Sequence, residues 1–262
     1  MKTKIHYFEV AAFTDRPFAG NPAGVCLLPD WLPDPTMQEI AAENNLAETA
    51  FVVDRGTNFD IRWMSPTVEV ALCGHATLGS AHVLFQHLGH TGTTIRFQSQ
   101  SGELTVERAG DRLVLDFPVQ PLSECDPPEN LAKSLGAKPT AVLKGRDYFA
   151  VFDREQEVAV LNPDFKMIAA LDTQGVIVTA PGGNCDFVSR YFVPKVGIDE
   201  DPATGSTHCA LIPYWSNRLN KRVLHARQLS KRGGEFFCED RGTRVGIGGN
   251  AVTYLEGKIW AG

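Results

Sequence analysis

The chain repeats part of its own sequence once, and this repeat limits the folds that it can adopt. Four residues recur 128 positions later, namely Phe59, Arg62, Pro66 and Val68 as Phe187, Arg190, Pro194 and Val196. Two later stretches, residues 73–76 and 110–115, resemble residues 204–207 and 242–247 in the same order. A solenoid repeats every 20–50 residues or so, which is much shorter than this period. The sequence therefore predicts two similar lobes related by pseudo-twofold symmetry.

Residue spacing within each half predicts several strands and one main helix. Apolar residues at helical spacing over 77–88 indicate a buried central helix. Residues 37–45 indicate a second, shorter helix, and the alternation over 98–106 and 112–117 is typical of antiparallel hairpins. Four prolines in residues 118–128 favour a connection between lobes. We therefore expect an α+β chain with lobes at 1–118 and 119–262, and leave open a return of the last strand to the first lobe.

Composition narrows the possible partners. The net charge is −6, which argues against nucleic acid, because binding to nucleic acid depends on clustered Lys and Arg. The chain has no stretch of about 18 apolar residues and no signal-like N-terminus, so we expect no membrane contact. Its six cysteines include no Cys-x-x-Cys pair, which is typical of reduced thiols in the cytoplasm rather than of disulfides or a zinc site.

The two equivalent stretches around Gly74 and Gly205 are candidates for binding an anion. If both glycines lie in the first turn of a helix, free backbone N–H groups there can bind a carboxylate. Glycine also lets a ligand approach the backbone closely. Simple helix capping is the alternative explanation for each glycine. The pairing of the two positions favours a site for a small carboxylic acid.

Glu48 is the candidate acid/base residue. It stands between a predicted helix and the apolar strand that begins at Ala50. Desolvation there would raise the pKa of the carboxyl group, and proton transfer at carbon requires a base whose pKa lies near the working pH. The alternative is an ordinary polar residue at a helix end.

Four further residues stand near the two glycines, and each has an ordinary structural explanation as well. His75 can orient or protonate a substrate, or be a surface residue at a helix start. Asp201 precedes Pro202, so it is either catalytic or a helix cap. Ser206 can bind the ligand or cap a helix, and the thiol of Cys73 is placed where a helix start lowers the pKa. The spacings of the histidines lack the i, i+4 pattern of ligands on one helix, so we expect no metal.

Four motifs, found in order along the chain, resemble the PhzF family of phenazine biosynthesis-like isomerases, which have the diaminopimelate epimerase fold. They are residues 13–25, which include Asn21, and residues 47–51, 65–77 and 200–206. The resemblance implies two lobes, each a mixed, largely antiparallel sheet curled around a central helix, in a homodimer. It also implies a carbon-to-carbon proton shift on a cyclic amino acid, without cofactor or metal.

The resemblance assigns roles to residues of this chain. Glu48 becomes the acid/base, and His75, Asp201 and Ser206 become ligand-orienting or proton-relay groups. Gly74 and Gly205 would hold the carboxylate, with Asn21 and Cys73 beside the substrate. Epimerases of this fold use two facing cysteines, whereas this chain has Cys73 and Thr204 at the two positions. We therefore predict a cytoplasmic isomerase acting through Glu48, with a Cys73-dependent racemase and a non-catalytic carboxylate-binding protein as alternatives.

Overall fold

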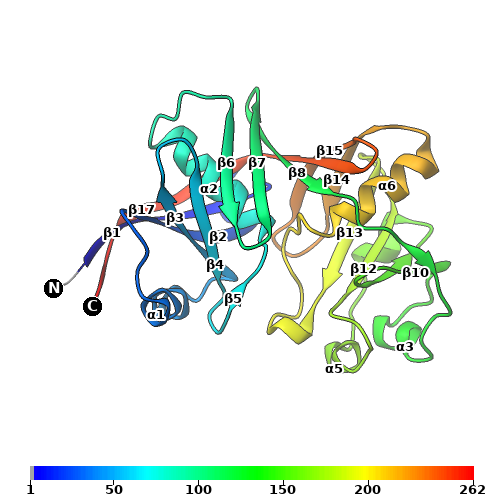
Figure 1. The fold of residues 1–262 in the computed structure, drawn as a ribbon. Helices are drawn as coiled ribbons and strands as arrows, with labels where there is room; N and C mark the ends of the chain where they lie inside the picture. Colours follow the sequence, from blue (N-terminus) through cyan, green and yellow to red (C-terminus); the bar gives the residue numbers. More distant parts are fainter. Residues whose placement is uncertain (1–2) are drawn as a thin grey trace. The chain divides into compact units, whose positions relative to one another are not determined.

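The computed structural model describes residues 3–262, which fall into two compact units (Figure 1). One unit contains residues 3–116 together with 248–262, and the other contains residues 117–247. The C-terminal strand thus belongs to the unit that contains the N-terminus. No helix among residues 3–262 is long and apolar enough to cross a membrane.

The first unit is a mixed sheet packed around one helix. Its strands are β1 (Thr3–Ala12), β2 (Asn21–Leu28), β3 (Glu48–Asp54), β4 (Phe59–Met64), β5 (Glu69–Val70), β6 (Thr94–Ser99), β7 (Gly102–Ala109) and β17 (Ala251–Ala261), with β8 (Arg112–Pro118) leading out of it. β17 pairs with β1 in antiparallel orientation. The helix α2 (Gly74–Gln86) packs against β1, β2, β3 and β17. Eleven of its residues are buried, which confirms the predicted central helix, although it begins at Gly74 rather than at Thr77.

The second unit repeats this arrangement with shorter elements. Its strands are β9 (Ser123–Glu124), β10 (Ala141–Lys144), β11 (Tyr148–Val151), β12 (Val176–Pro181), β13 (Phe187–Phe192), β14 (Val223–Gln228) and β15 (Gly234–Asp240), with β16 (Arg244–Gly249) leading back into the first unit. Its helices are α3 (Leu131–Leu135), α4 (Glu155–Ala159), α5 (Phe165–Ala169), the short 3₁₀ helix η1 (Pro194–Val196) and α6 (His208–Leu219). α6 packs against β14 and β15.

The pairing of strands is the clearest evidence of duplication. Along β1, β2, β3, β4, β6 and β7, successive pairs are antiparallel, parallel, antiparallel, parallel and antiparallel. Along β10, β11, β12, β13, β14 and β15, the same five orientations follow in the same order. The repeated stretch of sequence coincides with β4 and β13. The duplicated α+β fold predicted from the sequence is therefore confirmed.

Two predicted segments differ in part from the structure. The shorter helix, α1 (Asp34–Asn44), begins three residues before the predicted start, because prolines are tolerated in a first turn. Asn45 adopts a left-handed conformation that ends this helix instead of belonging to it. The segment over 118–128, predicted as a connection, contains the strand β9, which pairs with β10.

The connection between β1 and β2 carries the first motif and is unusually constrained. Phe13 and Phe18 both have positive φ, near 60° and 67°, which is uncommon for bulky residues. Gly20 also has positive φ, and a Cβ there would lie 2.2 Å from the carbonyl oxygen of Ala12. Only glycine fits at this position, so the motif glycine is a structural requirement of the tight connection into β2.

Candidate active site

Three of the predicted site residues meet in the first unit. The Oε2 atom of Glu48 lies 3.4 Å from Nε2 of His75. On the other side of the imidazole ring, Nδ1 of His75 lies 3.5 Å from Sγ of Cys73. The imidazole therefore stands between a carboxylate and a thiol, with one ring nitrogen facing each. This arrangement can pass a proton from one group to another through His75.

Exposure differs among the three side chains. The Glu48 side chain is 22% exposed, whereas the His75 side chain is 7% exposed. Cys73 is also buried, with 6% of its surface exposed. Glu48 is therefore the most exposed of the three side chains.

The sequence places these groups through two neighbouring elements. Glu48 is the first residue of β3, which is held by β2 on one side and by β4 on the other. The following residues, Ala50 and Phe51, are fully buried and anchor the strand in the core. Cys73 is the N-cap residue of α2 and is extended, with φ −139° and ψ 107°. Thr77 donates from its backbone N and its Oγ1 to the carbonyl oxygen of Cys73, which fixes the first turn of the helix.

The start of α2 has the form of an anion-binding site. The N-cap residue, Cys73, makes no side-chain cap hydrogen bond, and no acidic residue lies in the first turn of the helix. The first backbone N–H groups of a helix lack intrahelical acceptors, and the helix dipole adds partial positive charge there. Gly74 stands at the first helical position, as predicted. These donors lie next to His75, so a carboxylate bound there would approach the cluster of three residues.

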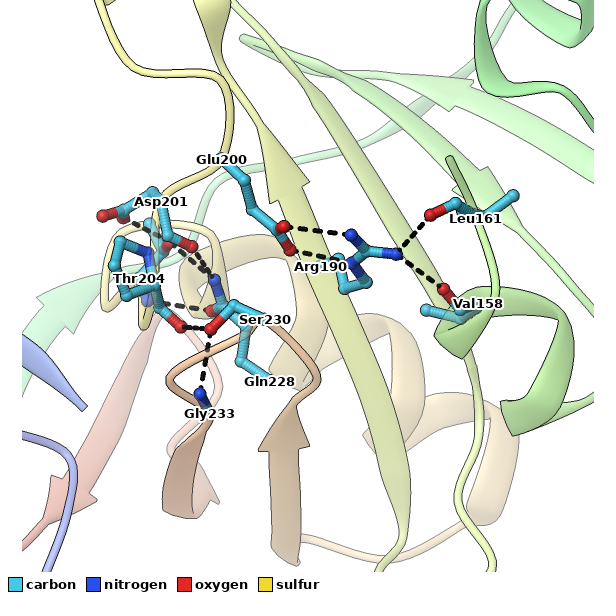
Figure 2. A network of polar contacts seen from close by, with 10 residues as sticks. Val158, Leu161, Arg190, Glu200, Asp201, Thr204, Gln228, Ser230 and Gly233 are labelled. Carbon is cyan, nitrogen blue, oxygen red and sulfur yellow. Dashed lines mark hydrogen bonds and ion pairs between the residues drawn. The ribbon is translucent and has the colours of Figure 1, made fainter. Parts of the chain in front are cut away.

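Asp201 belongs to a different network, in the second unit (Figure 2). Thr204 donates from Oγ1 to Oδ2 of Asp201 in a short hydrogen bond. Gln228 accepts from the backbone N of Thr204 at 2.8 Å and donates to the carbonyl oxygen of Asp201 at 2.6 Å. Gln228 also donates to Oγ1 of Thr204 at 3.1 Å and is almost fully buried. One amide side chain therefore holds the turn that carries Asp201.

Two expectations for this turn were wrong. Gly205 does not lie in the first turn of a helix, since α6 begins at His208, after a hydrogen-bonded turn. Asp201 does not cap a helix either, because the residues after Pro202 form a loop and not a helix. Ser206 lies in the turn before α6, where its carbonyl accepts from the backbone N of Cys209. The shape of the turn depends on Gln228, which the local sequence does not reveal.

Each unit also contains a forked ion pair, whose glutamate lies shortly before the candidate turn of that unit in the sequence. Arg62 donates from Nε and Nη2 to the two carboxylate oxygens of Glu69, both at 2.7 Å. Arg190 binds Glu200 in the same way, at 2.8 and 2.9 Å (Figure 2). The hydrogen bonds that Arg62 donates to Glu69 and then to Asp34 raise the pKa of its guanidinium. The recurrence of the two arginines in the sequence was the only signal of these ion pairs.

Asn21 and two further cysteines, Cys185 and Cys209, lie outside the cluster of Glu48, Cys73 and His75. Asn21 is fully buried at the start of β2, opposite Ala12, and its role at the substrate stays a prediction. Burial raises the pKa of the Cys209 thiol to about 12 and that of the Cys185 thiol to about 11. Such thiols stay protonated near neutral pH, so neither Cys185 nor Cys209 is a good base.

The comparisons with known proteins agree with this fold and its motifs. A protein of Pseudomonas aeruginosa described as an uncharacterized isomerase is 52% identical over 257 residues, which cover 98% of each chain. The crystal structure of a PhzF-family protein from Enterococcus faecalis has a TM-score of 0.96 at 46% identity, covering 98% of this chain and 99% of that one. A probable proline racemase from Agrobacterium radiobacter has a TM-score of 0.68 at 12% identity, covering 97% of this chain and 92% of that one, which shows the shared fold alone.

These findings confirm the predicted fold class and an enzyme of the isomerase type. The family model described as phenazine biosynthesis-like protein matches residues 10–257, which is nearly the whole chain. With that match and the relatives above, the chain belongs to the phenazine biosynthesis-like, or PhzF, family.

Proposed function

We propose that this isomerase moves a proton between carbons of a small carboxylic acid, with Glu48 as the acid/base and without a cofactor. The observation that carries this proposal is the order of exposure in the cluster. The Glu48 side chain is 22% exposed, whereas the side chains of His75 and Cys73 are buried. A substrate carbon would therefore meet the carboxylate of Glu48 before the imidazole or the thiol.

His75 is the partner of this base in the proposed reaction. The imidazole nitrogen Nε2 lies 3.4 Å from Oε2 of Glu48, close enough to exchange a proton with that carboxyl group. After Glu48 has taken a proton from carbon, His75 can hold or share it until it returns at another carbon. General acid–base catalysis of this kind typically contributes 10²–10⁴-fold to a rate.

The substrate would bind through its own carboxylate at the start of α2. The uncapped N–H groups near Gly74 suit that anion and would also stabilise enolate-like charge during the transfer. From the family resemblance, Asp201, Gly205 and Ser206 are further ligand-orienting groups, and the substrate is a cyclic amino acid. The same resemblance is the basis for proposing a homodimer and a cytoplasmic location.

A Cys73-dependent racemase is the enzyme alternative. Two-base racemisation would need a second thiol, and the equivalent position holds Thr204, whose hydroxyl donates to Asp201. A threonine hydroxyl is a far weaker acid than a thiol and does not replace it as a base. If alkylation of Cys73 leaves the activity intact, this alternative is excluded.

A panel of small cyclic and linear carboxylates in D₂O tests the proposal by NMR. We expect the wild type to introduce deuterium at a carbon of at least one compound, and Glu48→Gln to reduce this rate by 10²–10⁴-fold. Glu43→Gln, on the exposed face of α1, is the matched control and should exchange at the wild-type rate. Full activity in Glu48→Gln would refute the assignment of the base.

The same panel separates the enzyme from a carboxylate-binding protein of the same fold. Saturable binding of one compound with no exchange at any carbon would favour the binding protein. Retained binding in Glu48→Gln with lost exchange would support the enzyme, because the carboxylate site at α2 does not include Glu48.

A further inference from the structure

The cluster of Glu48, Cys73 and His75 combines three kinds of metal-binding group in one place. A carboxylate oxygen, a thiol sulfur and an imidazole nitrogen, one from each residue, all lie within 4.8 Å of one another. Thiolate, imidazole and carboxylate are the ligands that Zn²⁺ takes in proteins. Among residues 3–262, these are the three such side chains that come this close together.

We propose that this cluster binds a thiophilic divalent cation such as Zn²⁺ or Co²⁺, and that the bound cation occludes the carboxylate of Glu48. The proposal concerns metal binding itself and does not depend on which reaction the chain catalyses. The cation is an inhibitor in this proposal, because it occupies the oxygen lone pair that a proton-transferring base would use.

The distances suit one ion after a small side-chain adjustment. Bonds of about 2.0–2.3 Å at tetrahedral angles place two ligand atoms roughly 3.3–3.7 Å apart. The distance of 3.4 Å between Oε2 of Glu48 and Nε2 of His75 already falls in that range. Sγ of Cys73 lies nearest to the other ring nitrogen, at 3.5 Å, so the thiol or the ring has to rotate for all three to face one ion. A fourth position stays open for water or an external carboxylate.

Burial and charge also favour such an ion. Nε2 of His75 is fully buried and makes no hydrogen bond within residues 3–262, although Oε2 of Glu48 lies 3.4 Å away, so coordination would satisfy a polar atom that is costly to bury without such a bond. Binding breaks the S–H bond of Cys73, forms a metal–sulfur bond and releases the thiol proton to the buffer. Two anionic ligands then balance the 2+ charge, and the imidazole stays neutral. Mg²⁺ and Ca²⁺ prefer six or more oxygen ligands and should not compete.

Titration with Co²⁺, followed by absorption spectroscopy, tests the proposal on the intact chain. We expect one Co²⁺ to bind per chain and to give an intense near-ultraviolet band from thiolate-to-cobalt charge transfer. One equivalent of Zn²⁺ should displace the Co²⁺ and abolish this band. Cys73→Ser should lose the charge-transfer band. Glu48→Gln and His75→Ala should weaken binding by at least 10- to 100-fold, the loss expected when even an outer partner of a metal site is removed.

Cys125→Ser is the control, because Cys125 is a half-buried thiol of the second unit outside the cluster. It should bind Co²⁺ as the wild type does, and circular dichroism checks that each variant is folded. The proposal is overturned if the wild type binds no Co²⁺ at millimolar concentration, or if the band survives in Cys73→Ser. Unchanged affinity in His75→Ala or Glu48→Gln would equally overturn it. Bound Co²⁺ should also inhibit deuterium exchange, and binding that leaves the exchange rate unchanged would overturn the occlusion of Glu48.

Discussion

The two units share a scaffold but differ in the chemistry at equivalent positions. Both have the same series of strand orientations and an arginine on the fourth strand of that series, forked onto a glutamate. Both arginines also lie over an aromatic ring, Arg62 over Trp31 and Arg190 over Phe192. In both halves, these contacts fix the strand that carries the arginine, which precedes the main helix of that unit in the sequence.

The turns that follow differ. In the first unit, α2 starts directly at Gly74, and a thiol, an imidazole and a carboxylate gather there. In the second unit, the equivalent stretch forms a turn whose Thr204 and Asp201 are bound to each other and to Gln228. The first turn thus brings together a thiol, an imidazole and a carboxylate, whereas the second is dominated by hydrogen bonds within the turn and to Gln228. Under the proposed function, divergence at a few positions of a duplicated fold separates a half that transfers protons from a half that holds the ligand.

The largest expected difference between the halves is in catalysis, at the equivalent residues His75 and Ser206. His75→Gln should reduce deuterium exchange by roughly 10²-fold or more, because the partner of the base is lost. Ser206→Ala should reduce it by less than tenfold, since only one hydrogen-bonding group to the ligand is removed. Exchange rates measured by NMR on the same compound give both values. Equal losses would mean that the two halves contribute equally, contrary to the division proposed above.

The sequence predicted the features that depend on local or periodic patterns. The central helix followed from apolar spacing, and the duplication followed from residues such as Arg62 and Arg190 that recur at one interval. Glu48, His75 and Cys73 were named individually. Their meeting around one imidazole depends on the parallel register of β2 and β3 beside α2, which spacing along the chain does not encode.

Other features depended on contacts between distant segments. Gln228 ends β14, and its amide reaches residues more than twenty positions earlier because β14 pairs in parallel with β13. No local pattern distinguishes such a glutamine from a surface residue. For the same reason, the sequence suggested a helix start at Gly205, whereas the bonds to Gln228 help to hold a turn there.

The forked ion pairs provide a comparison of stability. The Arg190 side chain is 12% exposed and also donates to the carbonyl oxygens of Val158 and Leu161. Arg190→Met leaves Glu200 and these carbonyls without their partner, so we expect a loss of about 3 kcal/mol in the free energy of unfolding. Arg62→Met should cost about 2 kcal/mol, because Arg62 is 19% exposed and the remaining carboxylates stay closer to solvent.

Urea denaturation of the two variants measures this difference. Arg96→Met is the matched control, because its ion pair with Glu103 lies on the surface and should contribute less than about 1 kcal/mol. A larger loss for Arg62→Met than for Arg190→Met would contradict this expectation. It would show that the hydrogen bonds from Arg190 to the carbonyls of Val158 and Leu161 add no stability beyond that of the ion pair.

The smallest expected effect concerns pH and the buried His208 of α6. Burial lowers the pKa of His208 to about 4, and its Nδ1 hydrogen-bonds the carbonyl oxygen of Thr204 at 2.8 Å. Between about pH 6.5 and pH 4 the native state binds fewer protons at this site than the unfolded chain does, so stability decreases as the pH falls through that window. From pH 7.5 to 5.5, His208 alone should cost roughly 1.4 kcal/mol. Above about pH 7.5 the histidine is neutral in both states and contributes almost no slope.

His208→Asn isolates this contribution, because the amide of asparagine can keep the bond to Thr204 without titrating. The free energy of unfolding of this variant, from urea denaturation at several pH values, should fall less steeply below pH 6.5 than that of the wild type. The slope should not vanish, since burial also lowers the pKa of His82, in the first unit, to about 4. Identical slopes for variant and wild type would mean that His208 gains a proton in the folded protein as easily as in the unfolded chain. The surroundings of His208 would then be accessible to water, and the turn before α6 would be less rigid than its hydrogen bonds indicate.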